Sequence, residues 1–168
     1  MAKKADFTPE EWQQLLSLPQ VASLYLALAS PSGPLGIAQE MMASTKGIVE
    51  ALKSSSGNEL IDAVAADIRE KAEKRERLEP PLKTSNDPNE MKAQCVQIFR
   101  EAAALLSQKA PAEAQAYKQW VYQAAQNSAN AAKEGGVFGI GGERVSEAET
   151  AALKELAIAL DIPSVSGP

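Results

Sequence analysis

The feature that most constrains the fold is the spacing of apolar residues, which recur every three or four positions along most of the chain. That period matches one face of an α-helix, and no stretch alternates with period two for long enough to predict a strand. The chain has 168 residues, 45% of them hydrophobic and 23% charged, which suits a single globular domain. We therefore predict an all-α fold, a single-domain bundle or orthogonal array of six to seven helices over residues 1–160. Residues 161–168 are expected to form a flexible C-terminal tail.

The first helix has the clearest start signal. Thr8 stands at the N-cap, Pro9 at the first helical position and Glu11 at N3, which together form a capping box. The flanking Phe7 and Trp12 occupy the two positions of a hydrophobic staple. This helix is predicted to run from Pro9 to about Ser17. Leu18-Pro19 predicts a break, after which Val21–Ala29 reads as a short buried helix.

Five more helices follow from the same period and from capping signals. The first of them begins near Leu35, and the second carries an apolar face that runs from Ile61 to Ala72. The third has Asp87 at its N-cap, followed by Pro88 and Glu90, and the fourth runs from Pro111 to about Lys133. The last has Ser146 at its N-cap and Glu149 at N3. The proline-rich segment at 79–87 divides the chain, and we interpret it as a loop within one domain because neither half offers a full core. The charge run from Asp67 to Glu79 contains the (i, i+4) pairs Asp67–Lys71, Glu70–Lys74 and Glu73–Arg77. A solvated helix end is the favoured interpretation of that run, and a docking surface is the alternative.

Histidine is absent, and this excludes Ser–His–Asp and Cys–His catalysis as well as the usual zinc sites. Any enzyme would have to use carboxylates, Lys, Tyr, Ser or the single cysteine, so the sequence favours a protein that is not an enzyme. Cys95 lies on an apolar helix face, which predicts a core position rather than a reactive thiol. No EF-hand loop pattern is present. We expect no metal site and no cofactor.

The charge balance bears on partners and location. A net charge of −5 and an isoelectric point near 4.9 argue against nucleic acid and against an anionic membrane as the main partner. No apolar stretch reaches the roughly 20 residues that a membrane-spanning helix needs. The lone cysteine excludes an intrachain disulfide, and no signal peptide is visible. These observations predict a cytoplasmic protein.

The glycine-rich segment before the last helix is the best candidate ligand site. Five glycines in eight residues allow close backbone approach to a ligand, and the following helix N-terminus favours an anion. The segment has neither the Walker pattern nor a preceding strand, so a compact linker with Val137, Phe138 and Ile140 buried is the stronger alternative. The candidate ligand-binding residues are Gly135, Gly136, Gly139, Gly141, Gly142, Arg144 and Ser146.

Two weaker candidates remain. The turn Ser30–Pro34 presents hydroxyls on a rigid proline frame, although such a turn more often only redirects the chain. The other candidate is a surface for a protein partner. Trp120 and Tyr122 are predicted to flank the inner face of their helix and to be partly exposed there. Trp12 and the pair Met41 and Met42 are further candidates for that surface, and burial explains most of these residues equally well.

Two segments resemble a family of uncharacterised bacterial helical proteins. The segment Asp6–Trp12 with Ala29–Pro34, and the segment Gly135–Leu160, together carry this resemblance over about half the chain. It implies an all-helical fold and no established activity. The stretch Arg144–Glu149 is also similar to the helix start of TerB-like tellurite-resistance domains. Gly141-Gly142-Glu143 stands where that family has an acidic Asp-Gly turn, which argues against acidic metal ligation here.

The sequence therefore leads to two functional hypotheses. The first is a non-enzymatic cytosolic helical protein that works by binding a protein partner or by self-association. The alternative is a small-ligand module that binds an anion or a metal ion through the glycine-rich segment before the last helix.

Overall fold

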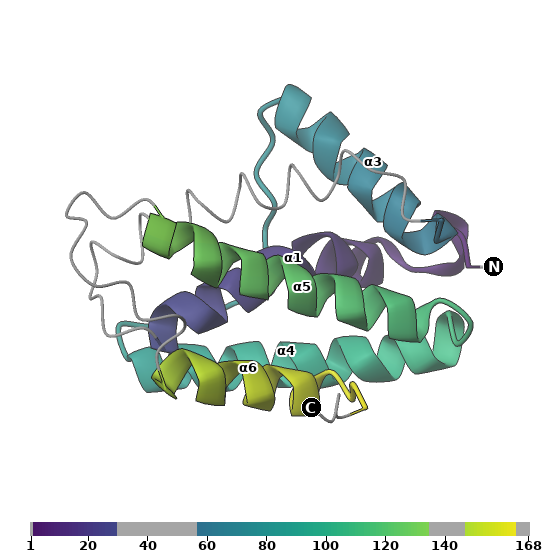
Figure 1. Cartoon of the computed structure of the whole chain (residues 1–168). Helices are drawn as coiled ribbons and strands as arrows, with labels where there is room; N and C mark the ends of the chain where they lie inside the picture. Colours follow the sequence, from purple (N-terminus) through teal and green to yellow (C-terminus); the bar gives the residue numbers. More distant parts are fainter. Residues whose placement is uncertain (1, 30–56, 135–146, 164–168) are drawn as a thin grey trace.

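The computed structural model describes residues 2–29, 57–134 and 147–163, and all structural statements refer to these parts (Figure 1). They contain α-helices and one short 3-10 helix, Lys4–Asp6, and no strand, which confirms the all-α, single-domain prediction. The helices are α1 (Pro9–Ala29), α3 (Glu59–Glu73), α4 (Pro88–Lys109), α5 (Ala114–Glu134) and α6 (Glu147–Ala159). The helix predicted from Leu35 lies outside the described residues.

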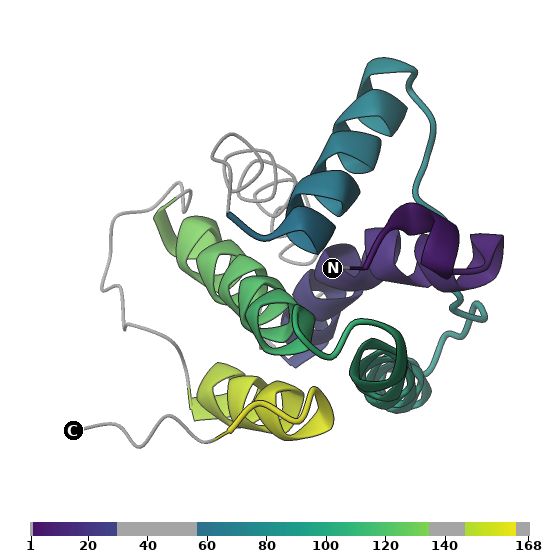
Figure 2. The same ribbon diagram turned by 90° about the vertical axis from the view of Figure 1, so that its right-hand side faces the viewer.

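Helix α1 is the centre of the fold and contacts all four other described helices. Its sequence is apolar nearly all round, so burial on several sides is the expected outcome. Helices α4, α5 and α6 pack around it, whereas α3 leans away from this group across α1 and α5 (Figures 1 and 2). The core is rich in Leu and Ala, and its largest fully buried side chains are Tyr117 and Phe99.

The predicted break at Leu18-Pro19 is wrong, because α1 continues through Pro19 to Ala29. Proline has no N–H, so the carbonyl of Leu15, four residues earlier, loses its helical donor. The buried hydroxyl of Tyr117 on α5 donates a 2.8 Å hydrogen bond to that carbonyl instead. A tertiary contact therefore satisfies the group that the proline left without a partner, and the helix is continuous.

The capping predictions for α1 and α4 are confirmed. The backbone N–H of Thr8 donates to Glu11 at 2.7 Å, and the N–H of Glu11 donates to the Thr8 hydroxyl at 3.3 Å. The staple is also present, since the rings of Phe7 and Trp12 lie 5.7 Å apart. At the start of α4, Asp87 accepts a 2.9 Å hydrogen bond from the N–H of Asn89.

Three predicted details differ from the structure. Ala72 is exposed rather than on the buried face of α3, because only the first part of that helix packs on its neighbours. Residues 111–113 form a turn, so α5 begins at Ala114 rather than at Pro111. Of the predicted (i, i+4) pairs, Glu70–Lys74 is present at 2.5 Å, whereas Asp67 binds Lys4 and Trp12.

The end of α6 is tied back to the helix. Asp161 has a positive φ of 54°, its N–H donates to the carbonyl of Ile158, and the N–H of Ile162 donates to the carbonyl of Ala157. These two bonds form a Schellman motif, in which the residue after the left-handed position packs on the helix. Asp161 and Ile162 are therefore ordered by α6, although the sequence assigned them to the flexible tail. Residues 164–168 lie outside the described part.

Candidate functional site: a groove between α5 and α6

The described residues show no candidate metal centre. No group of three or more Cys, Asp or Glu side chains in residues 2–29, 57–134 and 147–163 is placed to hold a metal ion. Cys95 is fully buried on α4, as predicted, and burial raises the pKa of its thiol to about 11. The thiol is therefore protonated at neutral pH and is a poor nucleophile.

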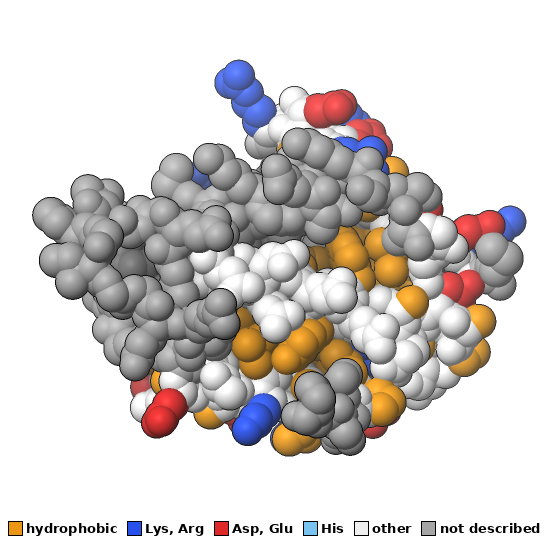
Figure 3. Space-filling model, viewed as in Figure 1, with side chains coloured by type: hydrophobic (Ala, Val, Ile, Leu, Met, Phe, Trp, Pro, Cys, Tyr) orange, Lys and Arg blue, Asp and Glu red, His pale blue; other side chains and the backbone are white. Residues whose placement is uncertain are grey.

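A groove of about 770 Å³ lies between α5 and α6. Helix α5 contributes Gln119, Tyr122, Gln123 and Gln126 to its lining. Helix α6 and the turn after it contribute Lys154, Ala157, Ile158, Ile162 and Pro163. Figure 3 shows hydrophobic side chains gathered between these two helices on this face of the molecule.

The groove follows from the side chains that the two helices turn toward each other. The apolar residues of α5, such as Tyr117 and Val121, face the core, so its glutamines lie along the flank next to α6. On α6 the half-buried Ala157 lines the groove. Its methyl group is too small to fill the space that a Leu or Ile would occupy, which leaves room between the helices.

Ile158 is the main apolar feature of the groove. Its side chain is 77% exposed, and it is the one large hydrophobic residue that is exposed in the described part of the chain. A single exposed isoleucine is ordinary on a protein surface. Here it adjoins a hollow lined by Tyr122, Ala157 and Ile162, so exposed apolar area and concave shape occur at the same place.

The charges at the groove are few and lie toward its ends. Lys154 is its one charged lining residue and makes no ion pair within the described residues. Asp161 follows α6, and its carboxylate forms an ion pair at 3.6 Å with the ammonium of the buried Lys118 on α5. That separation exceeds a hydrogen bond, and the Asp161 side chain remains 87% exposed. The Asp161 carboxylate is therefore accessible to a further cation.

Fixed contacts hold the two walls of the groove in place. The buried Tyr25 of α1 donates a short hydrogen bond to Glu155, which anchors α6 on the central helix. Burial raises the pKa of the Tyr25 phenol, and the hydrogen bond to Glu155 raises it further, so this hydroxyl keeps its proton. Tyr25 also makes an edge-to-face contact with Phe99 at 5.6 Å. The groove is thus framed by two packed helices and by the turn that follows α6.

The residues predicted from sequence fall in three places. Tyr122 lines the groove, which agrees with its prediction as a partly exposed surface residue. Trp120 is half-buried but does not line the groove, because its ring packs on Tyr117 with centroids 5.5 Å apart. Trp12 is buried. The ligand candidates from Gly135 to Ser146, the turn Ser30–Pro34 and the Met41–Met42 pair all lie outside the described residues.

The sequence interpretation missed Ile158, Lys154 and the glutamines of α5. One signal was available: Ile158 falls outside the apolar stripe of its helix, which Leu153, Leu156 and Leu160 form. A large apolar residue on the polar face of an amphipathic helix suggests a contact outside the core. The groove itself depends on how α5 and α6 pack, which residue spacing does not specify.

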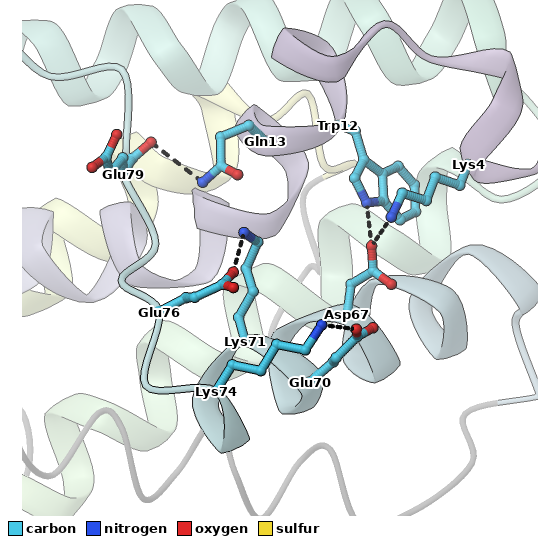
Figure 4. Close-up of polar contacts among 9 residues, drawn as sticks. All are labelled: Lys4, Trp12, Gln13, Asp67, Glu70, Lys71, Lys74, Glu76 and Glu79. Atoms are coloured by element: carbon cyan, nitrogen blue, oxygen red, sulfur yellow. Dashed lines mark hydrogen bonds and ion pairs between the residues drawn. The ribbon is translucent and has the colours of Figure 1, made fainter.

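A second polar cluster lies at the opposite side of α1, where α3 docks (Figure 4). Asp67 accepts hydrogen bonds from the Lys4 ammonium at 2.6 Å and from the Trp12 indole N–H at 2.7 Å. Partial burial would raise the pKa of Asp67, but the hydrogen bonds from Lys4 and Trp12 and the charges of Lys4 and Lys71 outweigh it and lower this pKa. Because Asp67, Lys4 and Trp12 pair with one another and join α3 to α1, we assign this cluster a structural role.

Comparisons with known proteins give no further guide to this site. The chain matches no protein family, no curated protein sequence and no solved structure. The resemblances noted in the sequence therefore stay predictions. A separate search of the described helices finds none that is both long and apolar enough to cross a membrane.

Proposed function

We propose that this chain is a protein-binding helical module that holds an apolar segment of its partner in the groove between α5 and α6. The observation that carries the proposal is Ile158, a large side chain left 77% exposed beside a groove of about 770 Å³. Burying an exposed isoleucine contributes roughly 1.5–3 kcal/mol to the free energy of association, so this one residue would stabilise a complex substantially.

The lining suits a protein segment. A protein interface usually has an apolar centre and a polar rim. The groove has the same arrangement, because Ile158, Ala157 and Ile162 are flanked by glutamine amides. The walls are mainly helices, so little ordering entropy is lost on binding. The part of α6 that lines the groove runs from Lys154 to Ile158, about 6 Å at 1.5 Å per residue, which corresponds to about one helical turn. A contact of this length supports reversible rather than permanent binding.

Site-specific photo-crosslinking in the cells that make the protein tests the proposal. A benzophenone amino acid is placed at Gln126, which lines the groove, or at Ala104, which is exposed on α4 away from it. The proposal predicts a discrete protein adduct from position 126 and none from position 104. Adding Ile158→Glu to the position 126 variant should remove the adduct, because a buried carboxylate without a partner is strongly disfavoured.

Equal adducts from both positions, or an adduct at 126 that survives Ile158→Glu, would reject the groove as the docking site. The mass of the adduct identifies the partner class, since a second copy adds another 17.8 kDa.

The second hypothesis, an anion or metal bound by Gly135, Gly136, Gly139, Gly141, Gly142, Arg144 and Ser146, rests on residues outside the described part. It stays a prediction of the sequence. Replacing Arg144 by Ala tests it, since loss of anion binding with unchanged folding stability is the expected result.

A further inference from the structure

We infer that the occupant of the groove is a second copy of this chain, docked antiparallel through α6 about a two-fold axis near Ile158. This inference rests on the proposed function, because it names the partner for the same groove. Apolar and charged groups lie along one exposed strip formed by α6 and the turn that follows it, and their order supports this inference.

The exposed strip contains both a projecting side chain and a hollow. Ile158 projects with 77% of its surface exposed, and the hollow next to it is lined by Tyr122, Ala157 and Ile162. A two-fold axis places the same patch on both copies, so each Ile158 can enter the hollow of the other. One residue and one hollow per copy are then enough to make the patch complementary to itself.

The charges specify the direction of packing. Lys154 lies one helical turn before Ile158, and Asp161 lies three residues after it, in the turn that follows α6. An axis passing between Ala157 and Ile158 is equidistant in sequence from Lys154 and Asp161. Antiparallel packing therefore sets Lys154 of each copy near Asp161 of the other, forming two equivalent ion pairs.

Both charged groups are accessible for such a contact. Lys154 has no ion pair in the described residues. The Asp161 carboxylate is ion-paired with Lys118 at 3.6 Å, but its side chain is 87% exposed and can accept a second cation. The neighbouring Glu155 is already bound to Tyr25 and faces α1. Parallel packing would instead set Lys154 against Lys154 and Asp161 against Asp161, so like charges disfavour it.

Sedimentation equilibrium of the full chain between about 10 µM and 1 mM, in physiological salt, tests the inference. The expected result is a mass that rises from 17.8 kDa toward twice that value. Ile158→Glu should weaken dimerisation by at least about tenfold, which corresponds to about 1.4 kcal/mol. Ala104→Glu adds the same charge to an exposed position on α4 and should leave the midpoint unchanged.

The antiparallel register of the two α6 helices is tested on the same sample with a carbodiimide, which joins amines to carboxylates that are in contact. Mixing chains labelled with ¹⁴N and ¹⁵N separates links within one chain from links between two chains. A mixed-isotope Lys154–Asp161 peptide is expected, whereas Lys118–Asp161 links should stay within one chain. Lys154→Gln should remove the mixed peptide.

Three results overturn the inference. The first is a mass that stays at 17.8 kDa up to 1 mM. The second is a dimer that Ile158→Glu does not weaken, and the third is mixed-isotope links that form only at other residues. The photo-crosslinking at Gln126 separates this failure from failure of the proposed function. An adduct to a different protein that depends on Ile158 would retain the groove and reject the second copy, and no adduct of any kind would reject both.

Discussion

At the scale of single residues, the fold depends on side chains that compensate for local sequence defects. Pro19 removes a hydrogen-bond donor from the middle of α1, and Tyr117 supplies a replacement from a different helix. A buried carbonyl without a partner costs about 1–3 kcal/mol, so this hydroxyl has a defined energetic role. The pair explains why a proline in the central helix is tolerated.

Tyr117→Phe is therefore expected to lower the free energy of unfolding by about 1–3 kcal/mol, because it leaves the Leu15 carbonyl unpaired. In a Pro19→Ala background the residue at 19 again has an N–H for that carbonyl, so the same Tyr117→Phe change should cost much less. Urea denaturation of the four variants in this double-mutant cycle measures the coupling. Equal costs in both backgrounds would show that the Leu15 carbonyl is not the relevant partner.

Cys95 gives a second test at this scale. Its side chain is fully buried and burial raises its pKa to about 11, so it should react with a thiol reagent at pH 8 at least about a hundredfold more slowly in the folded than in the unfolded protein. The rates are measured with a chromogenic disulfide, with and without guanidinium. Gln123→Cys, at an exposed groove position, is the control and should react rapidly. Fast reaction of Cys95 in the folded state would contradict its place in the core.

At the scale of elements, local signals in the sequence predicted helix starts better than helix continuity. Thr8, Glu11 and Asp87 act within three residues of themselves, so their capping roles could be inferred from spacing alone. The continuity of α1 through Pro19 depends on Tyr117, about a hundred residues away, and no local pattern contains that information. The groove was missed for the same reason, because it needs the relative placement of α5 and α6.

Helix α3 shows how one carboxylate can dock an element. Leu60, Ile61 and Val64 bury its first half, and Asp67 joins it to Trp12 and Lys4. Asp67→Asn is expected to lower the free energy of unfolding by about 1–2 kcal/mol at pH 7, because a charged acceptor of two hydrogen bonds is lost. Hydrogen exchange should accelerate in α3 more than in α4 or α5.

The effect of Asp67 on stability should also depend on pH. Its pKa in the folded protein lies below the ordinary value of 3.8, so folding favours the charged form. The contribution is fully present above the ordinary pKa and is lost as pH falls through the folded-state value. Asp67→Asn should therefore matter at pH 7 and little near pH 2. Glu73→Gln, on the exposed side of the same helix, is the control for removing one carboxylate from α3.

At the scale of the whole molecule, the core that stabilises the fold is distinct from the groove that we propose as a docking site. The spacing of apolar residues predicted the all-α class, and the absence of histidine excluded several catalytic classes. Neither could indicate which surface binds. The groove combines apolar lining with a concave shape, and Ile158 is one of its lining residues.

This separation predicts that Ile158 serves binding rather than stability. Ile158→Glu should change the free energy of unfolding of dilute protein by no more than about 0.5 kcal/mol, because the side chain is already 77% exposed. Leu156→Ala, in the buried stripe of the same helix, should cost about 2–5 kcal/mol. Urea denaturation of both variants at low micromolar concentration makes the comparison. A loss of several kcal/mol for Ile158→Glu would show that the residue packs within the monomer.

The most direct test of the central claim is the methyl resonance of Ile158 in protein labelled at isoleucine δ1 carbons. It is recorded first in dilute purified protein and then in a concentrated extract of the cells that make the protein. If the groove is a docking site, the Ile158 and Ile162 methyls should shift or broaden in the extract, while the buried Ile61 and Ile98 methyls stay unchanged. An Ile158 resonance that is the same in both samples would contradict the claim, since it would show the groove unoccupied where the partner is present.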